Sequence, residues 1–121
     1  MDYNTNPPHP LEGAWELVSG SYTGEDGVTV DYAQAEIHSL KVLSGDKFSF
    51  VTTTHGAFYA AAAGDYAADA GLYVEIPALA SHPEMLGQRY EFQFLLQGDT
   101  WENSRFQDGV RVEHEVWKRI Q

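Results

Sequence analysis

Short turns rich in Gly and Asp divide this sequence into segments of strand length. Three of them have the same character: Ser44-Gly45-Asp46, Gln97-Gly98-Asp99 and Gln107-Asp108-Gly109. Turns of this kind join neighbouring antiparallel strands, and their recurrence every eight to twelve residues or so is typical of all-β domains. The sequence has neither the strand–helix alternation of a parallel sheet nor a repeat of solenoid length. The turns therefore predict an all-β, antiparallel fold.

The segments between the turns supply about eight strands. The clearest alternation places Tyr90, Phe92, Phe94 and Leu96 on one face. Residues 19–31 are expected to form a long loop with a short strand at 28–30, and residues 78–87 a helical turn or an irregular loop. Successive hairpins favour an up-and-down barrel, with a sandwich as the alternative. The expected strands are residues 11–18, 35–43, 47–53, 57–66, 72–77, 89–96, 100–106 and 110–120.

The length of 121 residues suits one domain with one core. Residues 1–10 are polar and contain three Pro, so we expect an extended flexible arm, followed by a barrel domain over residues 11–121. The first ten residues lack the apolar stretch of a secretory signal, and the chain begins with Met. We therefore expect a cytoplasmic location.

Composition excludes several classes of function. A net charge of −11, from 18 acidic and 7 basic residues, argues against nucleic acid and anionic membranes as partners. The uncharged, Ala-rich stretch at residues 55–64 is too short and too weakly apolar to span a bilayer. There is no Cys, and the five His show no His-x-His or His-Glu-x-x-His spacing, so no metal site is expected. Phosphate-loop, dinucleotide and Gly-x-Ser-x-Gly motifs are missing as well, so no cofactor is expected.

Gly13-Ala14-Trp15 opens the first apolar segment. A bulky aromatic residue two positions after a Gly, on a strand, needs a closed core to occupy. The last apolar segment, residues 116–120, is the expected partner. We therefore predict that the first and last strands of the barrel meet at Trp15.

The same opening resembles the Gly-x-Trp strand of the lipocalin and calycin superfamily, and the chain is similar to small bacterial lipocalin-like domains. The resemblance implies an up-and-down barrel of about eight strands, a fold that hosts both carriers and enzymes. It also implies an Arg packed over the Trp, which makes Gly13, Trp15 and Arg119 the expected closure residues, with Arg111 as the alternative to Arg119. The pieces that carry it are residues 11–18, 47–51, 64–66, 72–75, 85–87 with 90–92, 98–101 and 115–119.

Strand 35–43 is apolar on both faces, so its orientation depends on Lys41. If Lys41 points to solvent, Glu36 and His38 project into the barrel as a general acid–base pair. Tyr73 and Tyr90 would then act as proton or oxyanion donors. These four residues are the catalytic candidates of an enzyme that needs no cofactor.

The last strand offers two orientations. Placing Trp117 inside also buries Glu113 and Glu115, which is costly unless both carboxylates are paired or hydrated. Placing His114 inside gives an apolar face with one imidazole. The burial cost favours His114 inside, whereas the resemblance around Glu115 and Trp117 favours the opposite orientation.

Three functions remain open. The first is binding of a small hydrophobic or aromatic molecule in the lumen. The second is the enzyme just described, an isomerase, cyclase or lyase acting on a hydrophobic substrate. The third is a structural domain with a filled barrel, and a free strand edge would allow a homodimer. The candidate ligand-binding residues are Phe48, Phe50, Phe58, Phe92, Phe94, Trp101, Asn103 and His114.

Overall fold

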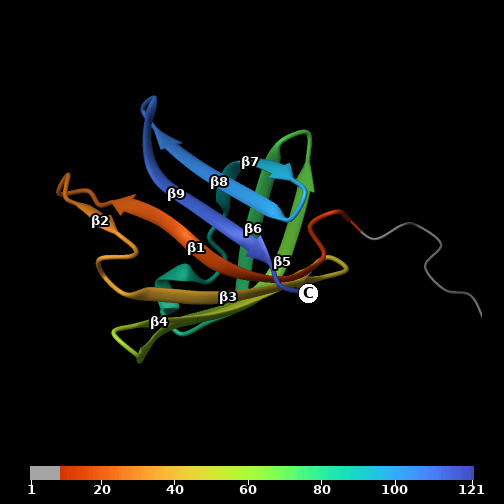
Figure 1. Cartoon of the computed structure of the whole chain (residues 1–121), viewed down its shortest axis with the longest axis horizontal. Helices are drawn as coiled ribbons and strands as arrows, with labels where there is room; N and C mark the ends of the chain where they lie inside the picture. The colour runs from red at the N-terminus through yellow and green to blue at the C-terminus, as the bar shows by residue number, and fades with distance from the viewer. Residues whose placement is uncertain (1–8) are drawn as a thin grey trace, which may run out of the picture.

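The computed structural model describes residues 9–121, so residues 1–8 of the expected arm lie outside the described residues. The described chain consists of nine strands and one short 3-10 helix (Figure 1). The helix falls inside the expected irregular segment 78–87. In chain order the elements are β1 Gly13–Thr23, β2 Thr29–Asp31, β3 Ile37–Ser44, β4 Lys47–Thr54, β5 Ala57–Asp69, β6 Leu72–Ala80, η1 Pro83–Met85, β7 Tyr90–Gln97, β8 Thr100–Gln107 and β9 Val110–Arg119.

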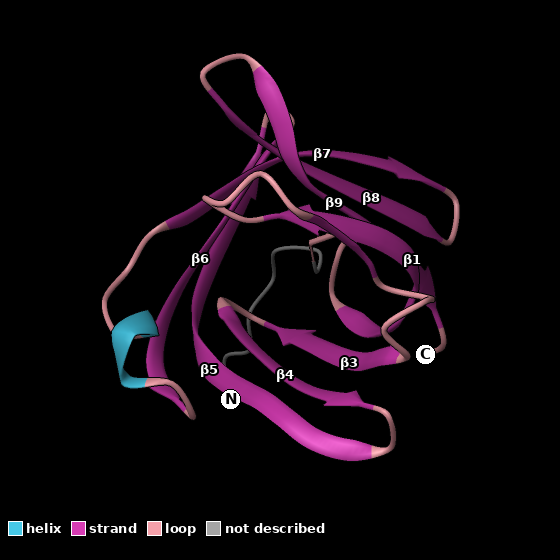
Figure 2. Ribbon diagram, turned by 90° about the vertical axis from the view of Figure 1, so that its left-hand side faces the viewer, coloured by secondary structure: helices cyan, strands magenta, loops and turns pink. Residues whose placement is uncertain are grey.

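Eight of the strands form a closed antiparallel barrel. From β3 to β9 each strand pairs with the next in the chain, and β1 pairs with both β3 and β9. The ring closes through pairs such as Trp15 with Arg119 and Leu17 with Trp117. The short β2 pairs only with the end of β1, outside the ring. Figure 2 shows the strands around a central axis, with η1 beside β6. The predicted all-β, up-and-down barrel of about eight strands is confirmed.

Three strands run further than the sequence pattern indicates. β1 continues to Thr23, β5 to Asp69 and β6 to Ala80. The expected strand ends at Pro77, a residue that cannot donate to a ladder. It is tolerated because the β5–β6 register shifts between Ala63 and Gly64, which places Pro77 opposite Gly64.

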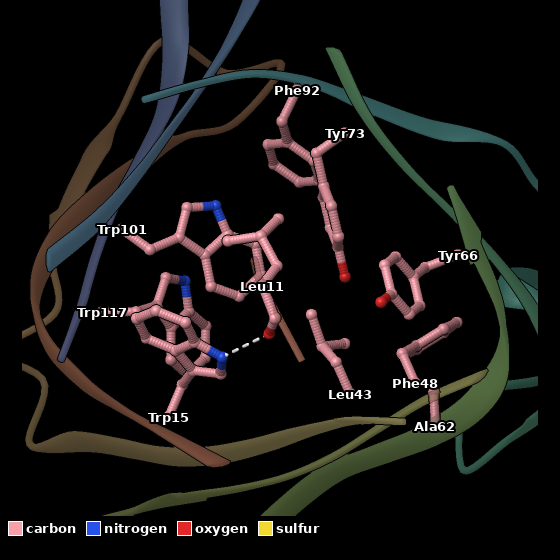
Figure 3. Close-up of a cluster of buried hydrophobic side chains, with 10 residues drawn as sticks. All are labelled: Leu11, Trp15, Leu43, Phe48, Ala62, Tyr66, Tyr73, Phe92, Trp101 and Trp117. Atoms are coloured by element: carbon pink, nitrogen blue, oxygen red, sulfur yellow. Dashed lines mark hydrogen bonds between the residues drawn. The ribbon is translucent and has the colours of Figure 1, made fainter. Parts of the chain in front are cut away.

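One end of the barrel is packed with side chains. Leu11 precedes β1, is fully buried and lies inside the ring of strands (Figure 3). Its carbonyl oxygen accepts a hydrogen bond of 2.9 Å from Nε1 of Trp15. His9 closes the same end, because its Nε2 donates to the carbonyl of Ala68 at 3.1 Å. The core cluster comprises Leu11, Trp15, Leu43, Phe48, Ala62, Tyr66, Tyr73, Phe92, Trp101 and Trp117.

The expected contact between Arg119 and Trp15 is present. The guanidinium carbon lies 4.3 Å from the centre of the indole, and the same guanidinium donates to the carbonyls of Glu12 and Pro10, both at 2.6 Å. Gly13 makes room for this arrangement, since a Cβ there would stand 2.8 Å from Nη1 of Arg119. Arg111, the alternative, is exposed on β9.

Within residues 9–121, no helix has the length and apolar character needed to cross a lipid bilayer.

Candidate functional site

The other end of the barrel contains a cavity of about 530 Å³. Its apolar wall consists of side chains such as Leu17, Phe50, Ala60, Met85 and Phe92. Tyr22, Tyr32, Tyr59 and Tyr90 also border it. Cavities of 300–1,000 Å³ or so with mostly apolar walls and a few polar groups are typical of sites for small molecules. The lumen is therefore packed at one end and open at the other.

The cavity lies above a polar floor built around Lys41. The side chain of Lys41 is 5% exposed, and its Nζ lies 2.5 Å from Oε2 of Glu75. The ammonium also lies within 6 Å of four aromatic ring centres, the nearest being Trp117 at 4.8 Å and Trp101 at 5.4 Å. An ammonium removed from water is stabilised by such a carboxylate and by such ring faces.

Lys41 remains protonated in this environment. Burial lowers its pKa, but the charges of Glu75 and Glu115 and the hydrogen bond to Glu75 outweigh that effect and hold the pKa above its usual value. Tyr73 donates its hydroxyl proton to the same Oε2 of Glu75 at 2.5 Å. Burial and the charge of Glu75 raise the pKa of Tyr73, so the phenol stays a donor. A protonated Lys41 has no lone pair, so it does not serve as a nucleophile.

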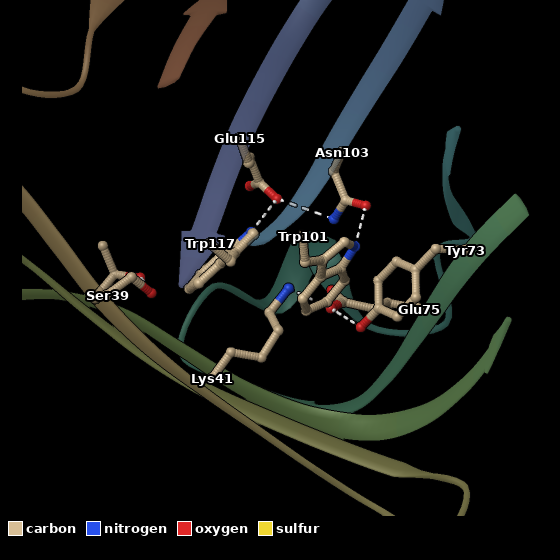
Figure 4. Close-up of polar contacts among 9 residues, drawn as sticks. Ser39, Lys41, Tyr73, Glu75, Trp101, Asn103, Glu115 and Trp117 are labelled. Atoms are coloured by element: carbon tan, nitrogen blue, oxygen red, sulfur yellow. Dashed lines mark hydrogen bonds and ion pairs between the residues drawn. The ribbon is translucent and has the colours of Figure 1, made fainter. Parts of the chain in front are cut away.

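Glu115 is held by neutral donors (Figure 4). Its Oε1 accepts hydrogen bonds from Nε1 of Trp117 at 3.1 Å and from Nδ2 of Asn103 at 3.3 Å. Asn103 is fully buried and its Oδ1 accepts from Nε1 of Trp101 at 2.7 Å. One Trp N–H and one amide N–H therefore orient this carboxylate, and the Trp101 N–H holds that amide in place.

Glu113 lies next to Glu115 on the lumen face of β9 and pairs with Arg105 of β8. Nε of Arg105 donates to Oε1 of Glu113 at 3.0 Å. Burial and the charge of Glu115 raise the pKa of Glu113 to about 7, against the lowering effect of Arg105. The cavity therefore contains a carboxyl group that exchanges its proton near neutral pH.

Two tyrosines at the cavity stay protonated over the same range. Burial, followed by the charges of Glu113 and Glu115, raises the pKa of Tyr32. Burial and the charge of Glu84 raise the pKa of Tyr90. Both phenols can donate hydrogen bonds to a bound molecule.

The predicted orientation of strand 35–43 is wrong. Lys41 points inward because Glu75 and the aromatic rings stabilise it there, so Ser39 and Leu43 are buried with it. Glu36 and His38 consequently lie on the outside and are exposed. The carboxylate of Glu36 pairs with Nδ1 of His55 at 2.5 Å and not with His38. The enzyme hypothesis built on Glu36 and His38 loses its geometric basis.

The orientation favoured for the last strand is also wrong. Trp117 is 2% exposed inside the barrel, while Glu113 and Glu115 border the cavity. His114 points to the outer face, where its Nε2 lies 3.4 Å from Oε1 of Glu102. The burial cost of the two carboxylates is offset by Arg105, Asn103 and Trp117.

The other candidates divide into three groups. Phe50, Phe92 and Tyr90 border the cavity. Phe48 is in the packed core, Phe94 packs against that core, and Tyr73, Trp101 and Asn103 are fully buried around the floor. Phe58 is 63% exposed, because the register shift between Thr52 and Thr53 turns it away from the lumen.

Lys41, Glu75, Arg105, Glu113 and Glu115 form the polar part of the cavity. The sequence offers Glu75 as a carboxylate partner beside Tyr73 and Arg105 as a residue that binds a ligand carboxylate, but it does not predict that these five groups meet. A signal for Glu75 was available. Tyr73 and Glu75 share a strand face, so an inward Tyr73 also buries a carboxylate that needs a cation. The pattern did not show which of the 7 basic residues supplies it.

No family model matches the chain, and the curated proteins include no match to its sequence. Within residues 9–121, no three His, Asp or Glu side chains are grouped to hold a metal ion. The fold and the cavity together define a closed eight-stranded antiparallel barrel with a half-open lumen. This architecture is compatible with a lipocalin-like fold.

Proposed function

We propose that this protein binds a small apolar or aromatic molecule in the open half of its barrel. The observation that carries the proposal is the cavity of about 530 Å³, whose walls include Leu17, Phe50 and Phe92. A domain with a purely structural role gains stability from a filled interior, because empty apolar volume costs packing energy. In this barrel the packed side chains reach only as far as Lys41, and the cavity lies beyond it.

The polar floor supports binding rather than catalysis. Each group beneath the cavity already has a partner that holds it in place: Lys41 has Glu75, Tyr73 has Glu75, and Asn103 has Trp101. Pre-organised polar groups of this kind orient a ligand at little entropic cost.

The test is binding of N-phenyl-1-naphthylamine, a neutral aromatic dye whose emission increases in apolar sites. We expect saturable binding of one dye per chain. Ala60 is buried on β5 and borders the cavity, so Ala60→Phe places a ring where the dye should lie. This variant should bind the dye at least about tenfold more weakly, because loss of a hydrophobic pocket contact costs a comparable factor.

The control is Ala67→Phe, which adds the same ring to the exposed outer face of the same strand. It should bind the dye as the parent does. Equal binding by the parent and Ala60→Phe would place the dye elsewhere and refute the proposal. Native mass spectrometry of the purified chain then tests whether a molecule from the expression host occupies the site.

A further inference from the structure

The acidic groups around the cavity outnumber the basic ones. Three carboxyl groups border it, Glu75, Glu113 and Glu115, against two cations, Lys41 and Arg105. Lys41 is committed to Glu75 and Arg105 to Glu113. Among residues 9–121, Glu115 has no ion-pair partner, and its two hydrogen bonds both reach Oε1 from neutral donors. One carboxylate of the apolar cavity therefore has no cation within ion-pairing distance and shares the field of Lys41 with Glu75.

We propose that the ligand of this cavity carries a protonated amine, which binds beside Glu115, on an apolar body that contacts Leu17, Phe50 and Phe92. This assignment rests on the proposed binding function and specifies its ligand class. The Glu115 carboxylate, which borders the cavity, supplies a charge-assisted hydrogen bond to the amine.

An anionic ligand fits the same surroundings poorly. The two cations at the cavity already have carboxylate partners, so an anion would have to displace one of them or lie unpaired near Glu115. The net charge of −11 also lowers the local concentration of anions and raises that of cations. A neutral ligand would leave the imbalance as it is.

The state of Glu113 agrees with this assignment. The charge of Glu115 helps to raise the pKa of Glu113 to about 7, so in the free protein near pH 7 the two carboxyl groups tend to share a proton. A bound cation beside Glu115 would neutralise the negative charge that the shared proton neutralises in the free protein. The groups that face Glu113 are Arg105 on β8, Lys41 on β3, Glu115 on β9 itself and Tyr32 before β3. Tyr22 on β1 lies opposite Glu113, and Tyr90 on β7 also lies within its field.

The experiment compares three probes of one shape by calorimetry at pH 7.5: 2-(naphthalen-1-yl)ethylamine, 2-(naphthalen-1-yl)ethanol and naphthalen-1-ylacetate. We expect the amine to bind at least about tenfold more tightly than the alcohol, because hydrogen bonds between ionised groups are about twice as strong as neutral ones. The acetate should bind most weakly. Amine binding should also release protons, seen as a dependence of the measured heat on the ionisation enthalpy of the buffer.

Glu115→Gln should abolish the advantage of the amine while the alcohol keeps its affinity, since the amide still accepts from Trp117. The matched control is Glu102→Gln, which removes one charge from β8 on the outer face, opposite Val116. This variant should still bind the amine more tightly than the alcohol.

Two results would overturn the assignment. In the first, the alcohol binds as tightly as the amine to the parent protein, and Ala60→Phe weakens both. The cavity then remains the binding site, and only the amine is wrong. In the second, none of the three probes binds, which also refutes the assignment of an amine ligand. The dye and mass-spectrometry experiments then decide separately whether the cavity binds anything.

Discussion

Lys41 on β3 and Glu75 on β6 form an ion pair inside the barrel, with two strands between them in the sheet. Both residues are buried, with 4% and 5% of their surface exposed. Glu75 also accepts the hydroxyl proton of Tyr73, so three buried polar groups depend on one another. The stability of the barrel should respond strongly when one of them is removed.

Lys41→Met should lower the free energy of unfolding by about 3–5 kcal/mol, because it leaves the charge of Glu75 buried without a counter-ion. Urea unfolding followed by Trp fluorescence measures the change. The double variant Lys41→Met with Glu75→Gln should be more stable than Lys41→Met alone, since the uncompensated charge is gone.

Lys47→Met is the matched control, since Lys47 pairs with Asp65 on the exposed face of the neighbouring strand. It should change stability little, because exposed ion pairs contribute little. If Lys41→Met costs no more than this control, the pair does not support the fold as described.

The same pair shows why sequence patterns predicted the barrel but not its floor. Strand direction and pairing follow from local turns and from alternation on strands such as β7, where one face is clearly apolar. Strand β3 is apolar on both faces, so only the general preference of lysine for solvent was available to orient it. The residue that overrides this preference is 34 positions away in the chain.

The predicted orientation of the last strand was wrong for a related reason. Burying Glu113 and Glu115 is unfavourable until Arg105 and Asn103 of β8 are known to lie opposite them. The register between β8 and β9 shows which residues lie opposite each other, and this register cannot be read from a single sequence. Closure at Trp15 was predictable because Gly13, Trp15 and Arg119 form a pattern that the resemblance names residue by residue.

Glu113 should make stability depend on pH. Its folded pKa is about 7, above the ordinary value of 4.5, so between these values the folded chain holds a proton that the unfolded chain releases. The contribution of Glu113 to the free energy of unfolding therefore falls as pH rises through this window. Between pH 5 and 8 the loss should be about 2 kcal/mol.

Glu113→Gln should remove this part of the pH dependence, measured by urea unfolding at pH 5 and pH 8. Glu102→Gln on the outer face should retain it. A direct measurement is the ¹³C chemical shift of the Glu113 carboxyl carbon. A titration midpoint near 4.5 would contradict the environment described for this group.

Arg119 should be sensitive to replacement by lysine although the charge is kept. The guanidinium carbon lies over Trp15, 4.3 Å from the ring centre, while two of its nitrogens reach the carbonyls of Glu12 and Pro10. An ammonium cannot make these contacts together. Arg119→Lys should cost roughly 1–3 kcal/mol.

Thermal unfolding measures this loss, and the near-ultraviolet circular dichroism of the Trp cluster should weaken with it. Arg111→Lys is the control, because Arg111 is exposed on the same strand. Equal effects of the two substitutions would show that the contact with Trp15 contributes no stability.

Gly64→Ala should disrupt the pairing of β5 with β6. A Cβ at Gly64 would stand 2.2 Å from the carbonyl oxygen of Ile76 and 2.9 Å from Cα of Pro77, and both are backbone atoms that a rotamer change cannot move. The strands must separate locally, so we expect a loss of more than about 2 kcal/mol in the free energy of unfolding. Hydrogen exchange should be faster in β5 and β6 than in β8 and β9.

Gly24→Ala is the control, because its nearest non-neighbour atom is a side-chain oxygen of Asp26 at 3.2 Å in an exposed loop. A Gly64→Ala protein as stable as this control would mean that the close approach of the two strands is not required.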